Sequence, residues 1–434
     1  MIGRIHSHTR LAFAVCSSNS HPSRFPFGPF NSAAQRRWKK PADTARTRLE
    51  DRTMDSKLDK LMTRLNALDD VLRVHSLMSA RRRGPFVSLQ RMSRWKNIIG
   101  LNIEVTRFVR KYPHVFWVFP HPKRRNLCCR VRARMHDLIE EERVAIRESE
   151  LDGVMRVRKL LMMSVTGRLR VHALRLIRRD LGLPEDFRDS VLVKYGDYFR
   201  LVDLEVVELV PRDDEEFGTA KVEEWREWEY REKWLSENET RFAFPIGFPT
   251  GYRIVAGFKE KLRNWQMLPY VKPYEKVEEG ERSHSRGAVA RFEKRVVGIL
   301  HELLSLTVEK RIAVERLAHF RRDLAFPINI QELLLKHPGI FYVSTKRGVL
   351  TVFLREAYDK GRLLNPGPVY TVRSKMLELI SSGRRNTKGL SGCEESGDEV
   401  HDTGAVVAEN PRGRDGEWAV PILNRLRKSK GDEL

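Results

Sequence analysis

Three short stretches of this chain repeat one pattern, and this repetition limits the possible folds more than any other feature. In each stretch a Lys precedes a turn-forming pair, a Phe follows, and a β-prone run comes after the Phe. The stretches are KYPHVFWVF (111–119), KYGDYFRLV (194–202) and KHPGIFYVS (336–344). Recurrence of one pattern within a chain is typical of a repeated structural unit, so we expect three related units.

The second and third copies also match upstream of the Lys. LLMMSVTGRLRVHALRLIRRDL (160–181) aligns without a gap with LLSLTVEKRIAVERLAHFRRDL (303–324), and ten of the 22 positions are identical. The apolar residues at 165, 169, 171, 174 and 177 approximate one face of a helix. This spacing predicts two helices in each copy: a short Leu-rich one, and a second that ends near Leu181.

A further helix is expected just before the Lys of each unit. Pro184 and Pro327 suit its first turn, where a missing N–H costs nothing, and Gly196 or Pro338 follows its end. The first copy follows this plan more loosely and lacks the Pro. The residues expected on the buried face are Val105, Phe108 and Val109 in the first copy, Phe187, Val191 and Leu192 in the second, and Ile330, Leu333 and Leu334 in the third.

A β-hairpin is predicted after the Phe of each unit. FYVSTKRGVLTVFL is typical of two strands around a Lys-Arg-Gly turn, while FWVFPHPKRRNLCCRV has a longer loop and FRLVDLEVVELV a shorter one. We expect the Phe to anchor each corner in the core and the Pro to turn the chain from helix to strand: Phe116, Phe199, Phe341, Pro113 and Pro338. The predicted fold class is α+β, predominantly helical, with three degenerate units of helices followed by a β-hairpin.

The N-terminal segment is rich in Arg and Ser and poor in acids. Residues 1–42 contain no Asp or Glu and seven Lys or Arg. This composition is typical of an organelle transit peptide, and the alternative is a basic arm kept on the mature protein. The Gly, Ser, Asp and Glu content after residue 380 predicts a disordered tail.

The whole chain is strongly basic. It has 81 Lys and Arg against 58 Asp and Glu, which gives a net charge of +23. Such an excess indicates a polyanionic partner, most simply nucleic acid, with an anionic membrane surface as the alternative. No apolar run approaches the roughly 18 residues that a bilayer requires, so we expect no integral membrane association.

No catalytic pattern is present. The chain lacks GxSxG, P-loop and HExxH motifs, and its four Cys do not have metal-ligand spacing, so we expect no catalytic residue, metal or cofactor. Cys128 and Cys129 lie in a β-prone run, and one of them should face the core. His337 stands where the other copies have Tyr112 and Tyr195, which indicates a semi-buried ring rather than a base.

Clusters of basic residues are the candidate nucleic-acid contacts, because phosphates are bound by forked or flexible cations on a fixed scaffold. The candidates are Arg81, Arg82, Arg83, Lys123, Arg124, Arg125, Arg130, Arg132, Arg134, Arg168, Arg170, Arg175, Arg178, Arg179, Lys346 and Arg347. Trp117 and Tyr342 occupy equivalent hairpin positions, alternate with core residues and can stack on splayed bases.

The longest motifs resemble the plant organelle RNA recognition (PORR) family. They are RKYPHVFWVF, LIRRDLGLPEDFRDSVLVKYGDYFRLV and LLLKHPGIFYVSTKRGVLTVFLREAYDKGRLL. The resemblance implies a plant protein imported into mitochondria or chloroplasts, with intron-containing RNA and other splicing factors as partners. It implies support of group II intron splicing without catalysis. The Arg-rich N-terminus favours the mitochondrion, with the chloroplast as the alternative.

Two other functions stay open. One is an RNA-binding role in another processing or ribosome-assembly step, and the other, from a different class, is a thiol hydrolase acting on protein. The expected organisation is a transit peptide (1–45), a PORR-like RNA-binding domain (55–380) with units at about 77–150, 155–210 and 295–365, an acidic insert (203–240), a connector (241–290) and a disordered tail (381–434).

Overall fold

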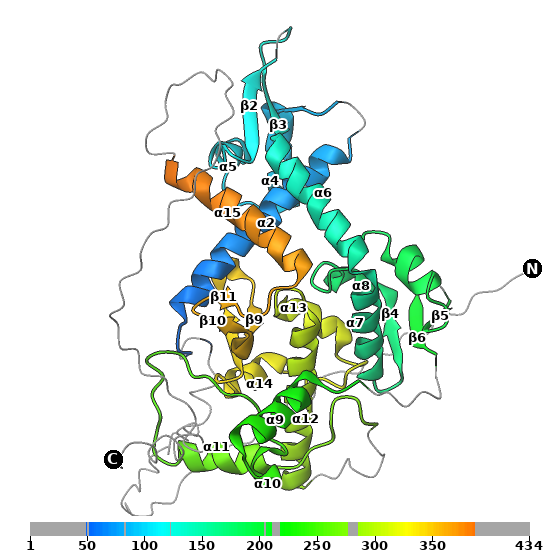
Figure 1. Cartoon of the computed structure of the whole chain (residues 1–434). Helices are drawn as coiled ribbons and strands as arrows, with labels where there is room; N and C mark the ends of the chain where they lie inside the picture. Colours follow the sequence, from blue (N-terminus) through cyan, green and yellow to red (C-terminus); the bar gives the residue numbers. More distant parts are fainter. Residues whose placement is uncertain are drawn as a thin grey trace, which may run out of the picture. The chain divides into compact units, whose positions relative to one another are not determined.

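Three small antiparallel sheets carry the repeated pattern (Figure 1). The structure is a computed structural model, and it describes residues 49, 52–81, 84–121, 123–203, 205–210, 218–276 and 285–386. The expected transit peptide and the tail beyond residue 386 lie outside these residues. Each sheet has three strands in the order first, third, second along the chain. The strands are β1 (Val87–Ser88), β2 (Phe116–Pro120) and β3 (Leu127–Val131); β4 (Arg168–Arg170), β5 (Phe199–Val202) and β6 (Val206–Leu209); and β7 (Arg311–Ala313), β8 (Phe341–Ser344) and β9 (Thr351–Leu354).

We call the segments that contain these three sheets repeat 1 (residues 87–131), repeat 2 (residues 160–209) and repeat 3 (residues 303–354). Helices make up most of the remaining described structure, so the predicted α+β, predominantly helical class is confirmed. The α-helices are α2 (Ser56–Ser79), α3 (Leu89–Met92), α4 (Lys96–Ile99), α5 (Val105–Arg110), α6 (Ala133–Glu148), α7 (Glu150–Met162), α8 (Val171–Ile177), α9 (Lys221–Lys233), α10 (Glu237–Thr240), α11 (Phe258–Met267), α12 (Arg286–Leu306), α13 (Val314–Leu317), α14 (Ile330–Lys336) and α15 (Pro368–Asn386). A small hairpin of β10 (Tyr358–Asp359) and β11 (Arg362–Leu363) precedes α15.

The corner between helix and strand is built identically in the three repeats. The Phe that starts each hairpin is 2% exposed, as expected of a core anchor. Its backbone N–H donates to the carbonyl of the residue four positions earlier, which is the ring-bearing residue after the Lys. The three bonds run from Phe116 to Tyr112 (3.0 Å), from Phe199 to Tyr195 (3.1 Å) and from Phe341 to His337 (3.0 Å).

The two consecutive helices predicted over residues 160–181 are interrupted by a strand. Helix α7 ends at Met162, the chain turns at Gly167, and β4 forms before α8 begins at Val171. Arg168 and Arg170 are exposed while Leu169 is buried, which is the period-two alternation of a strand. Val165, placed on the helical face by the spacing, is 53% exposed. The helical prediction was therefore wrong here because it joined apolar residues from a turn, a strand and a helix.

The helix before each Lys begins later than the Pro residues suggest. In repeat 3 it begins at Ile330, because the side chain of Asn329 accepts a hydrogen bond from the N–H of Glu332 and caps the first turn. The corresponding segment of repeat 2 is a π-helix over Arg188–Val193. The expected buried faces are confirmed except at Ile330, which is half-buried.

The segment between repeats 2 and 3 is more ordered than a connector. The acidic insert expected at 203–240 contains the helix α9, and the connector expected at 241–290 contains the helix α11. At the other end, α15 continues through Asn386, so the described helix extends past the expected start of the tail at residue 381.

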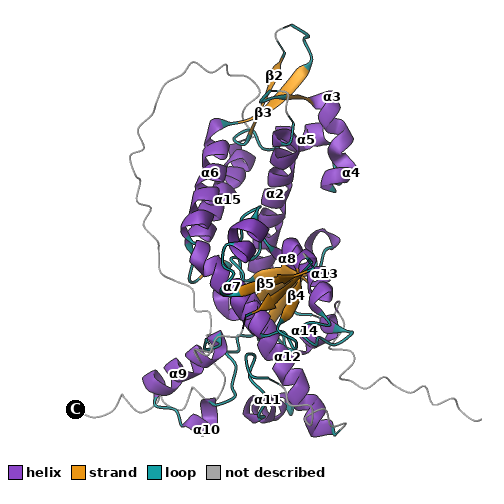
Figure 2. Ribbon diagram, turned by 90° about the vertical axis from the view of Figure 1, so that its right-hand side faces the viewer, coloured by secondary structure: helices purple, strands orange, loops and turns teal. Residues whose placement is uncertain are grey.

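Two hydrophobic clusters divide the core. One joins repeats 2 and 3 around α12, which contributes Val297, Leu300 and Leu304. The other joins repeat 1 to α2 and α15, and Figure 2 shows α2, α6 and α15 side by side. Sheet residues of repeat 3 also enter the second cluster, since Tyr342 and Phe353 belong to it.

Repeats 2 and 3 meet through a reciprocal pair of backbone hydrogen bonds. The N–H of Val165 donates to the carbonyl of Asp323 (2.9 Å), and the N–H of Val308 donates to the carbonyl of Asp180 (2.7 Å). Val165 and Val308 occupy equivalent positions of the repeated stretch, as do Asp180 and Asp323. The two repeats therefore face each other with approximate two-fold symmetry along this seam.

Candidate nucleic-acid interface

The tip of the β2–β3 hairpin presents three cations on a fixed turn. The ring of His121 holds the turn, because its Nδ1 accepts hydrogen bonds from the backbone N–H groups of Lys123 (3.1 Å) and Arg124 (3.2 Å). Arg125 closes the turn with a φ of 54°. All three cations are exposed, and their side chains have no hydrogen bond or ion pair with any described residue.

A stack of planar groups lies on one face of the same hairpin. Trp117 is paired with Arg130 across the strands, and the Arg130 guanidinium carbon is 4.1 Å from the centre of the Trp117 ring. Phe119 stacks on Trp117 with 4.7 Å between ring centroids, and Phe86 meets Phe119 edge-on at 5.8 Å. Trp117 is 38% exposed and Phe86 is 36% exposed. Bases stack on aromatic rings and on guanidinium planes, so this face suits unpaired nucleotides.

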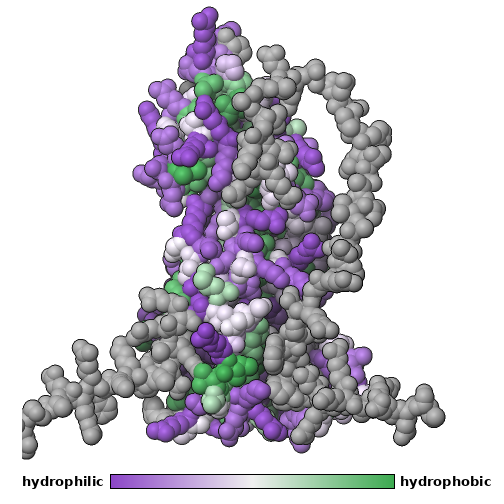
Figure 3. All heavy atoms as spheres, turned by 90° about the vertical axis from the view of Figure 1, so that its left-hand side faces the viewer, coloured by the Kyte–Doolittle hydropathy of each residue, from purple (hydrophilic) through white to green (hydrophobic). Residues whose placement is uncertain are grey.

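The surface around this hairpin has the same two-part character in Figure 3. Hydrophilic residues form the upper end of the molecule in that view, where the β2–β3 hairpin ends in Figure 1, and a hydrophobic patch lies directly below them. Arg134 adds an exposed cation at the start of α6. We call Phe86, Trp117, Phe119, Lys123–Arg125 and Arg130 the hairpin surface.

Other candidates near repeat 1 are less available. Arg132 is half-buried and donates from Nε to the carbonyl of Pro113 (2.7 Å), so it holds the two ends of the hairpin together. Arg81 is half-buried just beyond α2. Arg82 and Arg83 lie outside the described residues.

The two cations at the tip of the third hairpin are paired with groups of the protein. Arg347 Nη1 is 2.6 Å from Asp70 Oδ1, and Nη2 donates to the carbonyl of Gly100 at 2.8 Å. Lys346 Nζ is 3.5 Å from Asp59 Oδ2. Both Asp residues belong to α2, and their side chains are buried. These two cations hold the hairpin on α2, so they are less available to a ligand than Lys123–Arg125.

Tyr342 is also internal, and the expectation of a stacking ring there is wrong. The residue is 3% exposed and its hydroxyl accepts a hydrogen bond from the N–H of Asp55 (3.2 Å). Its repeat 1 counterpart, Trp117, is 38% exposed.

The cations of repeat 2 are divided between exposed and paired positions. Arg168 and Arg200 both pair with Glu208 (2.9 and 2.8 Å), and their hydrogen bonds lower the pKa of that carboxyl. Arg178 pairs with Glu185 at 3.3 Å. Arg175 is exposed on α8 and has no side-chain partner in the described part of the chain.

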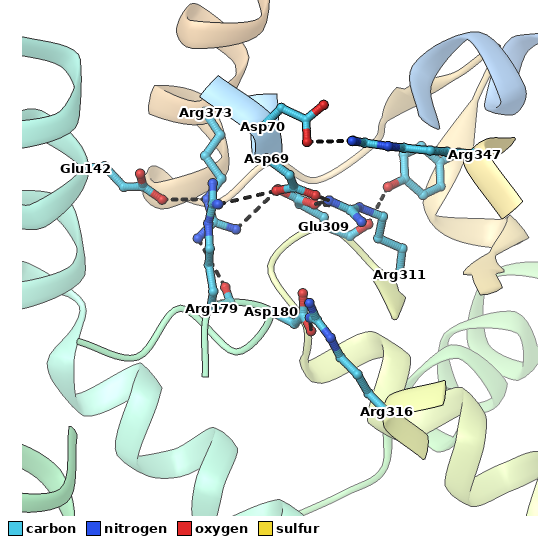
Figure 4. Close-up of polar contacts among 11 residues, drawn as sticks. Asp69, Asp70, Glu142, Arg179, Asp180, Glu309, Arg311, Arg316, Arg347 and Arg373 are labelled. Atoms are coloured by element: carbon cyan, nitrogen blue, oxygen red, sulfur yellow. Dashed lines mark hydrogen bonds and ion pairs between the residues drawn. The ribbon is translucent and has the colours of Figure 1, made fainter. Parts of the chain in front are cut away.

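Arg179 belongs to the ion network shown in Figure 4. It lies 3.3 Å from Asp69, which also faces Arg311 at 3.6 Å. Five carboxylates and five arginines are labelled there: Asp69, Asp70, Glu142, Asp180, Glu309, Arg179, Arg311, Arg316, Arg347 and Arg373. Sequence reasoning did not find this network, because its members lie on separate helices and strands and carry no motif beyond the repeated RRDL.

Glu309 is at the centre of this network. Burial alone would raise its pKa, but Arg311, Arg373 and Arg179 together lower the pKa to about 2. The carboxylate is therefore charged at neutral pH and tied to cations of repeat 2, repeat 3 and α15. These ion pairs stabilise the fold, and Arg179 is paired within them.

Most of the described region matches one known sequence family. The sequence model described as the plant organelle RNA recognition domain matches residues 53–385. The chain belongs to the plant organelle RNA recognition (PORR) family. The PORR match includes all three sheets, the segment between repeats 2 and 3, and α15 up to residue 385.

Several plant proteins are similar to this PORR chain. It is 39% identical over 350 residues to Protein ROOT PRIMORDIUM DEFECTIVE 1 of Arabidopsis thaliana, covering 78% of this chain and 85% of the relative. It is 31% identical to Protein WHAT'S THIS FACTOR 1, chloroplastic, of Zea mays (81% and 73% covered). It is 28% identical to Protein WHAT'S THIS FACTOR 9, mitochondrial, of Arabidopsis thaliana (70% and 79% covered). No solved structure matches the chain.

The two adjacent thiols of the PORR chain do not form a nucleophilic site. Cys129 lies in the core, where burial and then Cys128 raise its pKa to about 12 and keep the thiol protonated. Cys128 pairs with Phe119 across the strands and is 3% exposed. Within the described ranges, no group of three or more His, Cys, Asp or Glu side chains is placed to hold a metal ion. Among the same residues, no helix combines the length and apolar character needed to cross a bilayer.

Proposed function

We propose that this PORR protein is an organellar RNA-binding factor that binds intron RNA and promotes group II intron splicing without catalysing a reaction. The observation that carries the proposal is the hairpin surface, where three cations that pair with no described residue adjoin a stack of planar groups. Cations neutralise backbone phosphates, and the planar groups stack on bases that are not paired. The net charge of +23 adds long-range attraction for any RNA.

The mode of action that fits this surface is stabilisation of one RNA fold. A protein that binds one conformation better than its competitors shifts the population by no more than its differential affinity. The hairpin surface favours RNA with single-stranded or splayed bases next to a backbone path. Other splicing factors are the additional partners we propose.

An organellar location is supported by the basic, acid-free N-terminus and by two relatives whose names contain chloroplastic and mitochondrial. We favour the mitochondrion because the N-terminus is rich in Arg, with the chloroplast as the alternative. The second candidate function is RNA binding in another processing or ribosome-assembly step, since the same hairpin surface suits it. The hydrolase alternative is disfavoured by the buried, protonated Cys129.

The test is immunoprecipitation of the tagged full-length protein from plant mitochondria and chloroplasts, followed by sequencing of the bound RNA. Enrichment of a few intron-containing transcripts from one organelle supports the proposal and identifies the compartment. Enrichment of ribosomal RNA or intronless transcripts instead would favour the second candidate. Recovery of no RNA above background from either organelle would overturn both.

A further inference from the structure

An arginine-lined hollow opens at the seam between repeats 2 and 3. Its volume is about 360 Å³, and it is lined by Arg170, Ala318, Arg321, Arg322 and Phe326. Three of the five lining residues carry a permanent positive charge. We call this site the arginine hollow; it shares no residue with the hairpin surface.

The hollow lies beside one of two equivalent turns. The RRDL motif occurs at 178–181 in repeat 2 and at 321–324 in repeat 3. Both copies close with the same backbone bond, from Leu183 to Arg178 (2.8 Å) and from Phe326 to Arg321 (2.9 Å). The arginine pairs of the two motifs therefore start from the same backbone geometry.

The partners of these two arginine pairs differ. In repeat 2, Arg178 pairs with Glu185 and Arg179 with Asp69, so protein carboxylates neutralise the motif. In repeat 3, Arg321 and Arg322 are exposed, and neither side chain has a hydrogen bond or ion pair with another described residue. Acidic side chains therefore pair with both arginines of the first motif, and no described acid forms an ion pair with either arginine of the second.

The third arginine of the hollow is held in place. Arg170 donates from Nη2 to the carbonyl of His319 (2.5 Å), and its Nε lies 4.0 Å from Asp323 Oδ2, while 53% of the side chain stays exposed. Burial raises the pKa of Asp323, and the charges of Arg170 and Arg322 oppose this rise. With one carboxylate beside three arginines, the site keeps an excess of positive charge that a phosphate can neutralise.

We propose that the arginine hollow binds a backbone phosphate of the RNA, at a second position distinct from the hairpin surface. This inference rests on the proposed function and extends that function by assigning a second RNA-anchoring point at the seam. Arg170 supplies a guanidinium held by His319, and Arg321 and Arg322 supply two exposed ones that pair with no described residue. Because the site recognises phosphate, it contributes affinity and register without base specificity.

The test compares the full-length protein with two variants of the hollow. R321Q/R322Q removes two charges, and Ala318→Trp fills the hollow with the charge unchanged. The matched control is K360Q/R362Q, which removes two exposed cations from the β10–β11 hairpin. Binding of a fluorescein-labelled single-stranded RNA of mixed sequence is measured by anisotropy over a salt series, and thermal unfolding confirms that each variant is folded.

We expect R321Q/R322Q to lower the slope of log affinity against log salt by about 0.7 for each phosphate that the variant no longer neutralises. Ala318→Trp should weaken binding and lower the slope in the same way, and K360Q/R362Q should leave the slope unchanged. A slope equal to that of the wild type in R321Q/R322Q, with the hairpin tip still sensitive to charge removal, would overturn the second phosphate site and leave the proposed function intact. An equal decrease in K360Q/R362Q would also overturn it, because the effect would then be one of net charge.

Two further outcomes distinguish binding of free phosphate from a failure of the proposed function. If inorganic phosphate stabilises the wild type but not R321Q/R322Q, and RNA binding is unchanged, the hollow binds free phosphate and its role in RNA binding is overturned. If the wild-type chain binds no RNA at all, the proposed function fails together with this inference.

Discussion

Arg373 donates from Nη1 to Glu309 across 3.2 Å, and the two side chains are 1% and 6% exposed. The same guanidinium donates from Nε to Glu142 (2.6 Å) and from Nη2 to the carbonyl of Arg179 (3.1 Å). One side chain of α15 thus joins α6, repeat 2 and repeat 3 (Figure 4). Each of its three nitrogens donates inside the protein, so Arg373 acts in the fold and not at the RNA.

Replacing Arg373 with Met should destabilise the protein strongly, because Glu142 and Glu309 would lose a buried cation. Breaking a buried ion pair from one side typically costs about 3–5 kcal/mol. The matched control on the same helix is Lys375→Met, whose pair with Glu141 is about half exposed and should cost less than about 1 kcal/mol. Urea unfolding of both variants measures the difference, and equal decreases in stability would contradict a structural role for the network.

Replacing Lys123, Arg124 and Arg125 together with Gln should weaken RNA binding and reduce its salt dependence. Each single-strand phosphate that is no longer neutralised removes about 0.7 from the log–log slope. The unfolding free energy should stay within about 0.5 kcal/mol of the wild type, since these side chains have no described partner. The control is K259Q/R263Q/R362Q, which removes three exposed cations elsewhere. An unchanged slope in the tip variant would show that the tip is not at the interface.

Trp117→Ala should affect RNA binding and Tyr342→Ala should affect stability, although the two residues occupy equivalent positions. Trp117→Ala should weaken binding of single-stranded RNA by about 1–3 kcal/mol and leave stability nearly unchanged. Tyr342→Ala should leave binding by the folded protein unchanged but destabilise it by about 3–5 kcal/mol, because it empties a buried ring position. Anisotropy titration and thermal unfolding of both variants check this; weaker RNA binding by folded Tyr342→Ala would contradict the assignment.

Lys294 should couple the stability of the protein to pH. Its buried Nζ donates to the carbonyls of Trp265, Gln266 and Leu268 at 2.7–2.8 Å, at the end of α11. Lys294→Met would leave these acceptors without a donor, at about 1–3 kcal/mol for each buried one. We therefore expect a marked decrease in stability, measured by urea unfolding.

The pH dependence of this decrease has a definite sign. Burial, and to a smaller degree Arg226, lowers the pKa of Lys294 to about 6, whereas an unfolded Lys titrates near about 10.4. Between these values the unfolded chain binds more protons than the folded one, so the stability from Lys294 increases as pH rises. The advantage of the wild type over Lys294→Met should grow from about pH 6 to about pH 9. An advantage that stays constant over this range would show that the folded state keeps the ammonium.

The sequence by itself determined the three hairpin corners, because they depend on local properties. A Phe placed four residues after a ring-bearing residue, next to a β-prone run, is enough to predict the buried anchors Phe116, Phe199 and Phe341. The strand at 168–170 was missed because three residues between two helices give too short an alternation to outweigh the helical period.

Only the tertiary structure decided which cations are free. Lys123–Arg125 and Lys346–Arg347 look alike in the sequence, since both are basic turns between two strands. Helix α2, distant in sequence from repeat 3, places Asp59 and Asp70 against the second of these turns, and no described carboxylate pairs with the first. The two RRDL motifs differ for the same reason: Asp69 of α2 pairs with Arg179, and no described acid pairs with Arg322. Local sequence sets the charge and its geometry, but the packing of distant helices decides whether the protein or a ligand neutralises it.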